Sequence, residues 1–238
     1  MTIAFISDLH ISAKRPSSIM LFTDFMDKSG ALLESVYILG DLFDFWIGDD
    51  GSQALGYSLV EQALKKATDG GTKVYFIAGN RDFLVGTDFA ERTGVQLLDD
   101  MTILEIDDQR IMIAHGDRVC IDDTDYMQAR ATFTDPAWQA DILSKSIEER
   151  KEIAEQLRAL SEETKSGKPK DIMDVNKDEV KRVLEDNNID ILIHGHTHRP
   201  YVHSIELSGR TARRYVLGEW LDDRSVVYGN QGKYYLKK

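Results

Sequence analysis

Five short runs of apolar, strand-favouring residues divide this chain, and each is followed at once by polar side chains that carry a free lone pair. The runs span residues 3–6, 36–39, 74–77, 111–114 and 189–193. Because they are continuously apolar rather than alternating, we expect strands that are covered on both faces. The side chains that follow them are carboxylates, imidazoles and one carboxamide: Asp8, His10, Asp41, Asn80, His115, His196 and His198.

The segments between these runs predict a layered α/β domain. Residues 17–28 and 52–69 have helical character and separate the first three runs, which is the alternation expected when helices cover a sheet. Residues 201–235 instead predict strands separated by turn pairs such as Ser208-Gly209 and Gly229-Asn230. We therefore expect a second sheet stacked on the first.

A polar, helix-favouring stretch from 122 to 163 interrupts this pattern and predicts a helical insertion over the core. Its apolar residues recur near helical spacing: Leu143, Ile147, Ile153, Leu157 and Leu160. A lysine-bearing loop with Gly and Pro follows at 161–170, before a further predicted helix at 174–187. We predict one domain spanning residues 1–238, with a helical cap inserted at about 122–170.

The acidic composition argues against one class of function. The 238 residues carry a formal net charge of −12 and no basic run, whereas nucleic-acid-binding proteins neutralise phosphates with surplus Lys and Arg. A phosphate-bearing substrate must therefore be held by local cations.

Cys120 is the only cysteine, so no intramolecular disulfide forms, and we interpret it as a small packing residue.

The sequence predicts neither secretion nor a membrane span. The N-terminus enters a strand at once, without a signal-peptide pattern, so we expect the mature chain to begin near Met1. No apolar stretch approaches the roughly 18 residues of a membrane-spanning helix. We expect a cytoplasmic protein for which any membrane contact is peripheral, and no feature indicates an obligate protein partner.

The polar residues after the runs predict a metal centre. Functional groups collect beyond the carboxyl ends of the strands in an open α/β sheet, so all seven should meet in one crevice. Carboxylate, imidazole and amide ligands suit Mn²⁺, Fe²⁺ or Zn²⁺. Seven ligands suit two ions, roughly 3.5–4 Å apart, with Asp41 between them. A lone Asp after a strand is usually a turn residue and a lone His a packing residue, but the recurrence in five places favours the metal site.

Five motifs resemble the signature of the calcineurin-like metallophosphoesterases: Asp8-Leu9-His10, Gly40-Asp41, Gly79-Asn80-Arg81-Asp82, His115-Gly116-Asp117 and Gly195-His196-Thr197-His198. The resemblance implies a four-layer αββα fold, a double β-sandwich flanked by helices. It also implies two sets of ligands. One ion would be held by Asp8, His10, Asp41 and His198, and the other by Asp41, Asn80, His115 and His196. We interpret His194 as a packing residue at the end of its strand.

Longer motifs narrow the resemblance to the UDP-2,3-diacylglucosamine hydrolase family, over nearly the whole chain. They span residues 37–43, 46–50, 79–84, 172–176 and 194–200. This resemblance implies two ions, expected to be Mn²⁺, and attack of metal-activated water on the α-phosphate of UDP-2,3-diacylglucosamine. The products would be UMP and 2,3-diacylglucosamine 1-phosphate (lipid X), a step of lipid A biosynthesis. It further implies peripheral contact with the cytoplasmic face of the inner membrane.

Arg81 distinguishes this chain from many members of the superfamily, which carry a histidine after the metal-binding asparagine. A guanidinium stays charged, so it stabilises phosphate oxygens but cannot donate a proton as a general acid. A sugar phosphate leaving from a pyrophosphate is a stable anion and needs no proton. We assign catalysis to Arg81 on this reasoning, and to Asn80 and His196 as residues that the family resemblance places at the metal centre. The alternative is an arginine that only pairs with Asp82 at the surface.

The family resemblance assigns substrate contacts to one further set of residues: Asn80, Arg81, Asp123, Ser161, Lys165, Lys168 and His196. The insertion would supply an apolar chamber for acyl chains. Lys165 stands where the family often has a polar amide, and the charges at 148–152 predict a solvated helix face. The candidates for acyl contact are Phe133, Trp138, Ile142 and Leu143, which could equally pack the insertion onto the domain.

Three large side chains outside this set are interpreted as structural: Trp46, Trp220 and His203.

Two other functions remain open. A broader metal-dependent phosphodiesterase or nucleotide pyrophosphatase would keep the ions but lack the acyl chains. A scaffold that had lost catalysis would keep only the fold, and the complete set of ligand types argues against it.

Overall fold

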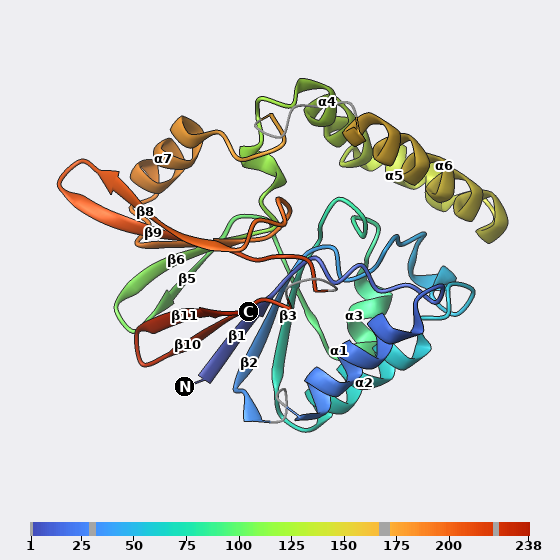
Figure 1. Ribbon diagram of the computed structural model, residues 1–238. Coiled ribbons are helices and arrows are strands. Elements are labelled where there is room, and N and C mark those ends of the chain that lie inside the picture. Colours follow the sequence, from blue (N-terminus) through green and yellow to red (C-terminus); the bar gives the residue numbers. More distant parts are fainter. Residues whose placement is uncertain (1, 29–31, 167–171, 221–223) are drawn as a thin grey trace.

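A computed structural model describes residues 2–28, 32–166, 172–220 and 224–238. Two β-sheets pack face to face, and helices cover both outer faces, as Figure 1 shows. The predicted four-layer αββα class is confirmed. Among the described residues, no helix has the length and apolar character that crossing a membrane requires.

The first sheet has the strand order β11-β10-β1-β2-β3-β4. Its parallel strands are β1 (Thr2–Ile6), β2 (Ser35–Leu39), β3 (Lys73–Ile77) and β4 (Gln96–Leu98), and its antiparallel strands are β10 (Val226–Asn230) and β11 (Lys233–Lys237). The second sheet has the order β5-β6-β7-β9-β8. Parallel β6 (Gln109–Ala114), β7 (Ile191–His194) and β9 (Arg210–Val216) lie between antiparallel β5 (Thr102–Ile106) and β8 (Tyr201–Leu207).

Strands that are apolar on both faces explain the layers. Ala4 and Ile6 of β1 pack under the helices α1 (Pro16–Lys28), α2 (Ser58–Asp69) and α3 (Thr87–Thr93), whereas Ile3 and Phe5 pack between the sheets. A third apolar cluster fills the space between the second sheet and α7 (Lys177–Asp186). Side chains alternate across a strand, so a continuous apolar run can supply two cores.

The C-terminal strands correct one prediction. β8 and β9 join the second sheet, but β10 and β11 return to the first sheet, where β10 pairs with β1. Gly229-Asn230 is therefore strand rather than turn, and the chain reverses at Gln231-Gly232, both with positive φ. The buried Val226 and Val227 explain this return, because both faces of β10 are covered.

Three helix boundaries also differ from the predictions. Helix α6 (Ile147–Ser166) continues through residues 161–166, where a loop was predicted. The helix predicted at 52–69 begins at Ser58, after a 3₁₀ turn η2 (Asp49–Gly51) and further turns. The helix predicted at 174–187 begins at Lys177, because the Asn176 side chain accepts a hydrogen bond from the backbone N–H of Glu179 at 2.9 Å. Such a cap fixes where a helix starts.

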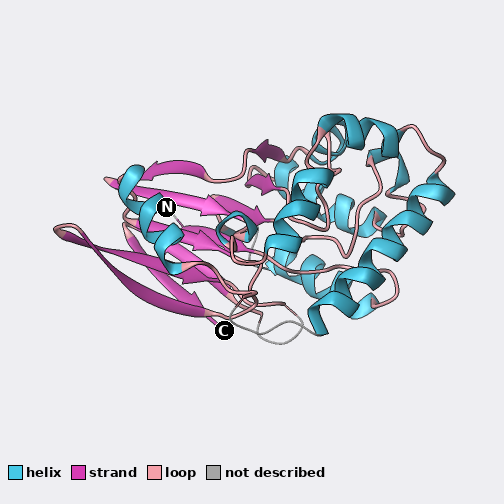
Figure 2. Cartoon of the chain, turned by 90° about the horizontal axis from the view of Figure 1, so that it is seen from above, coloured by secondary structure: helices cyan, strands magenta, loops and turns pink. Residues whose placement is uncertain are grey.

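Three helices occupy the predicted insertion: α4 (Thr124–Phe133), α5 (Pro136–Leu143) and α6 (Ile147–Ser166). Figure 1 shows them grouped on one side of the sheets, and we call them the cap. Figure 2, seen from above, shows that most helices lie toward one end of the strands. Its limits as a unit at about 122–170 stay a prediction. Arg150 of α6 is buried, pairs with both carboxylate oxygens of Asp50 and donates to the Ile47 carbonyl at 2.6 Å. The predicted solvated face therefore holds for its neighbours but not for Arg150.

Candidate metal centre

The seven predicted ligands lie beyond the carboxyl ends of five strands that belong to two sheets. Residues 8 and 10 follow β1, 41 follows β2, 80 follows β3, 115 follows β6, and 196 and 198 follow β7. The crevice predicted beyond the strand ends is therefore formed by two stacked sheets together. The sheets pack with these strand ends at a common edge, below the cap in Figure 1. The distances between the side chains show that they meet there.

The backbone around this edge adopts an unusual conformation. Asp8, His10, Asp41, His196 and His198 have positive φ angles of 57°, 45°, 53°, 65° and 53°. A left-handed conformation costs a residue with a side chain roughly 1–2 kcal/mol, so such residues persist where the surrounding structure holds them, and they cluster at functional sites. Close packing explains the glycine at position 79, because a Cβ there would collide with Asp41 Oδ1.

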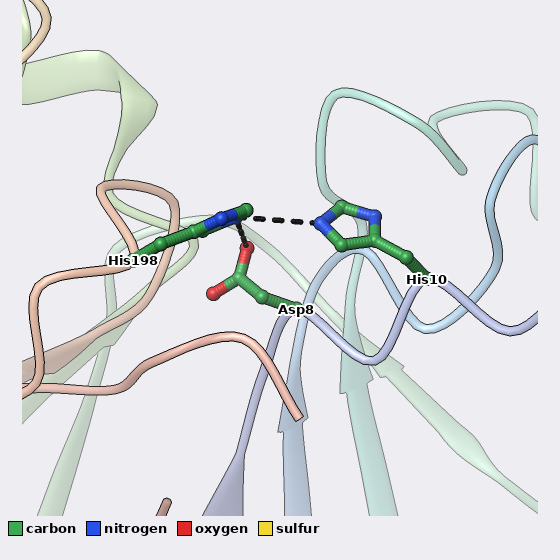
Figure 3. A group of neighbouring side chains, drawn as sticks. All are labelled: Asp8, His10 and His198. Atoms are coloured by element: carbon green, nitrogen blue, oxygen red, sulfur yellow. Dashed lines mark hydrogen bonds and ion pairs between the residues drawn. The ribbon is translucent and has the colours of Figure 1, made fainter. Parts of the chain in front are cut away.

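Asp8, His10 and His198 form the first group, drawn in Figure 3. The Nε2 atoms of His10 and His198 face each other at 3.3 Å, and His198 Nε2 lies 3.3 Å from Asp8 Oδ1. Two nitrogens bound tetrahedrally to one ion at about 2.0–2.1 Å would be roughly 3.3 Å apart. Asp8 Oδ1 is buried, and the polar contact recorded for it among the described residues is His198 Nε2, itself a candidate ligand, so a cation fits this position.

Asn80, His115 and His196 form the second group. His115 Nε2 lies 3.0 Å from Asn80 Oδ1 and 3.3 Å from His196 Nδ1, and His196 Nδ1 lies 3.1 Å from Asn80 Oδ1. His115 Nδ1 lies 2.9 Å from the Leu39 carbonyl oxygen. A proton donated to that carbonyl leaves the Nε2 lone pair free for an ion.

Asp41 lies between the two groups. Its Oδ2 is 3.8 Å from His10 Nδ1, and its Oδ1 is 3.7 Å from His115 Nε2. Asp8, Asp41 and His115 also offer ligand atoms close enough to share an ion. One carboxylate oxygen thus faces each side, which suits a bridging ligand, and the residues present fit a pair of divalent ions.

The surroundings of this site shift the pKa values of two of its histidines in opposite directions. Burial and the neighbouring His115 lower the pKa of His196 to about 4. Burial also acts to lower the pKa of His198, but hydrogen bonds to Asp8 and Glu219 outweigh it and raise this pKa to about 10. His198 would have to give up a proton to hold an ion through Nε2, because only an unprotonated imidazole nitrogen binds metal.

Asp82 supports the loop that carries Asp41. It is fully buried and accepts hydrogen bonds from the backbone N–H groups of Gly79, Asp41, Leu42 and Phe43 at 2.8, 3.2, 2.8 and 3.3 Å. Burial and the charge of Asp41 raise its pKa to about 7. No ion pair joins Asp82 to Arg81 in the described structure, so the alternative of a surface pair is wrong.

We expect Asp82→Asn to lower the free energy of unfolding by about 2 kcal/mol, because the amide turns a donor toward backbone donors that need an acceptor. Urea denaturation of the metal-free chain measures this change. Asp88→Asn, on the exposed side of α3, is the matched control and should change stability by less than about 0.5 kcal/mol. Equal stability of the two variants would contradict the assigned support.

A cavity of about 360 Å³ separates the cap from the metal centre. Asn80 and Arg81 line one part of it, with the predicted contacts Asp123 and Ser161. The rest is mainly apolar and includes Phe133, Trp138 and Ile142 but not Leu143. Lys168 lies outside the described residues, and so does the side chain of Lys165.

The other interpreted residues are placed as follows. Trp220 and Cys120 are buried in apolar clusters, and His194 is buried at the end of β7, as predicted. Trp46 is also in the core but lines the cavity as well. His203 is half-buried on β8.

Sequence reasoning missed the polar network beside His196. The Tyr126 hydroxyl donates to Asp117 Oδ2 at 2.6 Å, Arg130 Nε donates to the same oxygen at 2.8 Å, and the rings of Tyr126 and His196 are 5.4 Å apart. Asp117 stands in the His115-Gly116-Asp117 motif and could have been singled out. Tyr126, Arg130 and Glu219 carry no local signal.

Comparisons with known proteins agree with this geometry. The family model of the calcineurin-like phosphoesterases matches residues 1–200. UDP-2,3-diacylglucosamine hydrolase of Chromohalobacter salexigens is 43% identical over 224 residues, which cover 94% of this chain and 91% of the relative. The enzyme of the same name from Aliivibrio fischeri is 42% identical over 240 residues, with 100% and 98% coverage.

Among solved structures, a dimetal phosphatase from Danio rerio has a similar fold, with a TM-score of 0.53 and 12% sequence identity, covering 100% of this chain and 95% of that one. The assignment to a narrower family rests on the sequence relatives. The chain is a hydrolase of the calcineurin-like phosphoesterases and belongs to the UDP-2,3-diacylglucosamine hydrolase family.

Proposed function

We propose that the chain hydrolyses the pyrophosphate bond of UDP-2,3-diacylglucosamine, giving UMP and 2,3-diacylglucosamine 1-phosphate. The observation that carries this proposal is the continuity of the site, since Asn80 belongs to the metal centre and also lines the cavity under the cap. A substrate whose pyrophosphate lies at the metal centre would thus place its acyl chains beside the apolar wall of the cavity. The names of the relatives describe the same substrate.

The two ions are assigned to the two groups of ligands, with Mn²⁺ as the proposed metal. Asp8, His10, Asp41 and His198 would hold one ion, and Asp41, Asn80, His115 and His196 the other. Divalent ions in such a site lower the pKa of a coordinated water and offset negative charge on the phosphoryl oxygens. The mixed oxygen and nitrogen donor set supports Mn²⁺ over softer ions.

Arg81 supplies the positive charge that the protein itself brings to the pyrophosphate. Its backbone N–H donates to Asp41 Oδ1 at 2.9 Å, which fixes its place beside the centre, and its side chain lines the cavity. Burial lowers the pKa of His10, and the charge of Arg81 acts in the same direction. The guanidinium can hold two phosphate oxygens at once but cannot protonate a leaving group.

We expect Arg81→His to lower kcat/KM for the pyrophosphate by about 10- to 30-fold at pH 8, the loss of one charged hydrogen bond of roughly 1.5–2 kcal/mol. A phosphodiester with a poor alkoxide leaving group should lose less, because histidine can protonate that group. The ratio of the two rates measures the effect. Full activity of this variant on the pyrophosphate would contradict the assignment.

Two of the remaining proposed contacts, Asp123 and Ser161, line the cavity under the cap. Asp123, Ser161, Lys165, Lys168 and His196 are proposed to bind the substrate's polar groups. Asp123 also accepts a hydrogen bond from the Tyr126 backbone N–H at 3.1 Å, so it caps α4 as well. Phe133, Trp138 and Ile142 are proposed to contact the acyl chains.

Peripheral contact with the cytoplasmic face of the inner membrane completes the proposal. Leu157 and Leu160 line the cavity yet are 46% and 60% exposed, which supports entry of acyl chains from a lipid surface on this side of the cap. The net charge of −12 supports the absence of a nucleic-acid partner.

Hydrolysis in ¹⁸O-labelled water tests the proposal. The chain with Mn²⁺ is given UDP-2,3-diacylglucosamine, UDP-N-acetylglucosamine and an aryl phosphodiester. We expect strong preference for the diacylated substrate and label in UMP, which marks attack at the α-phosphorus. Equal turnover of all three would favour the broader phosphodiesterase, and metal binding without turnover would favour the scaffold.

A further inference from the structure

Glu219 is a carboxylate outside the predicted ligand set that faces one of its histidines. Glu219 Oε2 lies 3.4 Å from Nδ1 of His198, while Nε2 of the same ring faces Asp8 and His10. The imidazole thus lies between an outer carboxylate on one nitrogen and the candidate ligands on the other. An arrangement of this kind fixes which nitrogen keeps the proton.

The segment that carries Glu219 is fixed on both sides. Before it, the backbone N–H of Leu217 donates to the His194 carbonyl at 2.8 Å. After it, the backbone N–H of Trp220 donates to the carbonyl of Asp8 at 3.2 Å, and the Trp220 ring packs edge-on against Phe25 at 5.1 Å. The backbone that carries the Glu219 carboxylate is therefore hydrogen-bonded to Asp8 and to His194, next to the candidate ligands.

His115 offers a comparison within the same site. Its Nδ1 faces the backbone carbonyl of Leu39 at 2.9 Å, so no substitution of a side chain can remove that partner. The partner of His198 is a side chain. Glu219 is consequently the place where orientation of a ligand imidazole can be changed without changing any ligand.

We propose that Glu219 is a positioning residue, which holds the proton of His198 on Nδ1 and so strengthens binding of the ion assigned to Asp8, His10, Asp41 and His198. The inference rests on the proposed placement of that ion. It predicts that the two ions respond unequally to a change at residue 219, because the second group of ligands does not contact Glu219 in the described structure.

The test is a Mn²⁺ titration of the metal-free chain in which free Mn²⁺ is measured by electron paramagnetic resonance. We expect Glu219→Ala to weaken the binding of one of the two ions by about 10- to 100-fold and to leave the affinity for the other unchanged. Glu219→Gln, whose amide oxygen still accepts the Nδ1 proton, should stay within about threefold of the native affinity. Glu206→Ala, an exposed glutamate of β8 that contacts Thr211, is the matched control and should bind as the native chain does.

Two further measurements separate the possible failures. Thermal unfolding of the metal-free variants shows whether a variant folds, and Glu219→Asp, which withdraws the carboxylate by one methylene, replaces the alanine variant if that one does not. His198→Ala is the reference. If it loses one ion while Glu219→Ala keeps both at native affinity, the inference is overturned. If His198→Ala itself keeps both ions, the placement of the ion is wrong instead.

Discussion

Asp41→Ala is expected to lower kcat/KM for the pyrophosphate by about 10³-fold or more and to leave at most one tightly bound divalent ion. Asp41 directs one carboxylate oxygen toward His10 and the other toward His115, so its loss removes a ligand from both groups at once. Neither His10 nor His115 can replace it. Steady-state kinetics with saturating Mn²⁺, together with the metal content after gel filtration, measures both effects.

The controls for this prediction separate the bridge from general damage. Asp24→Ala changes an exposed carboxylate of α1 that pairs only with Lys28 among the described contacts, and it should keep native activity and two ions. Single-ligand variants such as His10→Ala should retain one tight ion. An Asp41→Ala chain that still held two ions and lost less than about tenfold in kcat/KM would show that Asp41 does not bridge.

The seven candidate ligands could be singled out from the sequence because each is a polar residue that closely follows an apolar run. His115 and Asp8 needed no knowledge of the sheets to be singled out. Their distribution over two sheets could not be predicted, because a continuous apolar run looks the same in either sheet. The return of β10 to β1 depends on pairing across most of the chain, which local pattern does not carry.

The supporting residues could not be predicted for a related reason. Asp82, Tyr126 and Glu219 act through partners that are distant in sequence or set by a loop, and a lone carboxylate or tyrosine has many ordinary explanations. Arg150 shows the reverse error. Its charged neighbours indicated a solvated face, but the partner Asp50 lies about one hundred residues earlier and makes burial of the guanidinium acceptable.

The cap presents the same limit at its apolar positions. Helical spacing cannot distinguish a side chain that packs the cap from one that lines a cavity, and Ile153 does both, since it lies against the core cluster and also lines the cavity. Phe133 stacks on Phe83 at 4.8 Å and lines the cavity too. Packing and substrate contact are therefore not exclusive alternatives here.

Ala129→Trp is expected to separate acyl-chain binding from catalysis. Ala129 lines the cavity on α4, so a tryptophan there would occupy space assigned to the acyl chains. We expect kcat/KM for the long-chain substrate to fall about 100-fold, which corresponds to an overpacking cost of roughly 2–3 kcal/mol. An analogue with short acyl chains should lose less than about threefold, because the metal centre and Arg81 are unchanged. The ratio of the two kcat/KM values is the measurement.

The matched control is Ala131→Trp, two residues along the same helix, where the side chain is exposed and does not line the cavity. It adds the same ring to α4 and should leave both substrates unaffected. If Ala129→Trp slowed the long-chain and short-chain substrates equally, the cavity would be a packing defect of the cap rather than an acyl site. If it slowed neither, the acyl chains must bind elsewhere, and the broader phosphodiesterase would then fit this chain better, because the metal centre alone does not require a lipid.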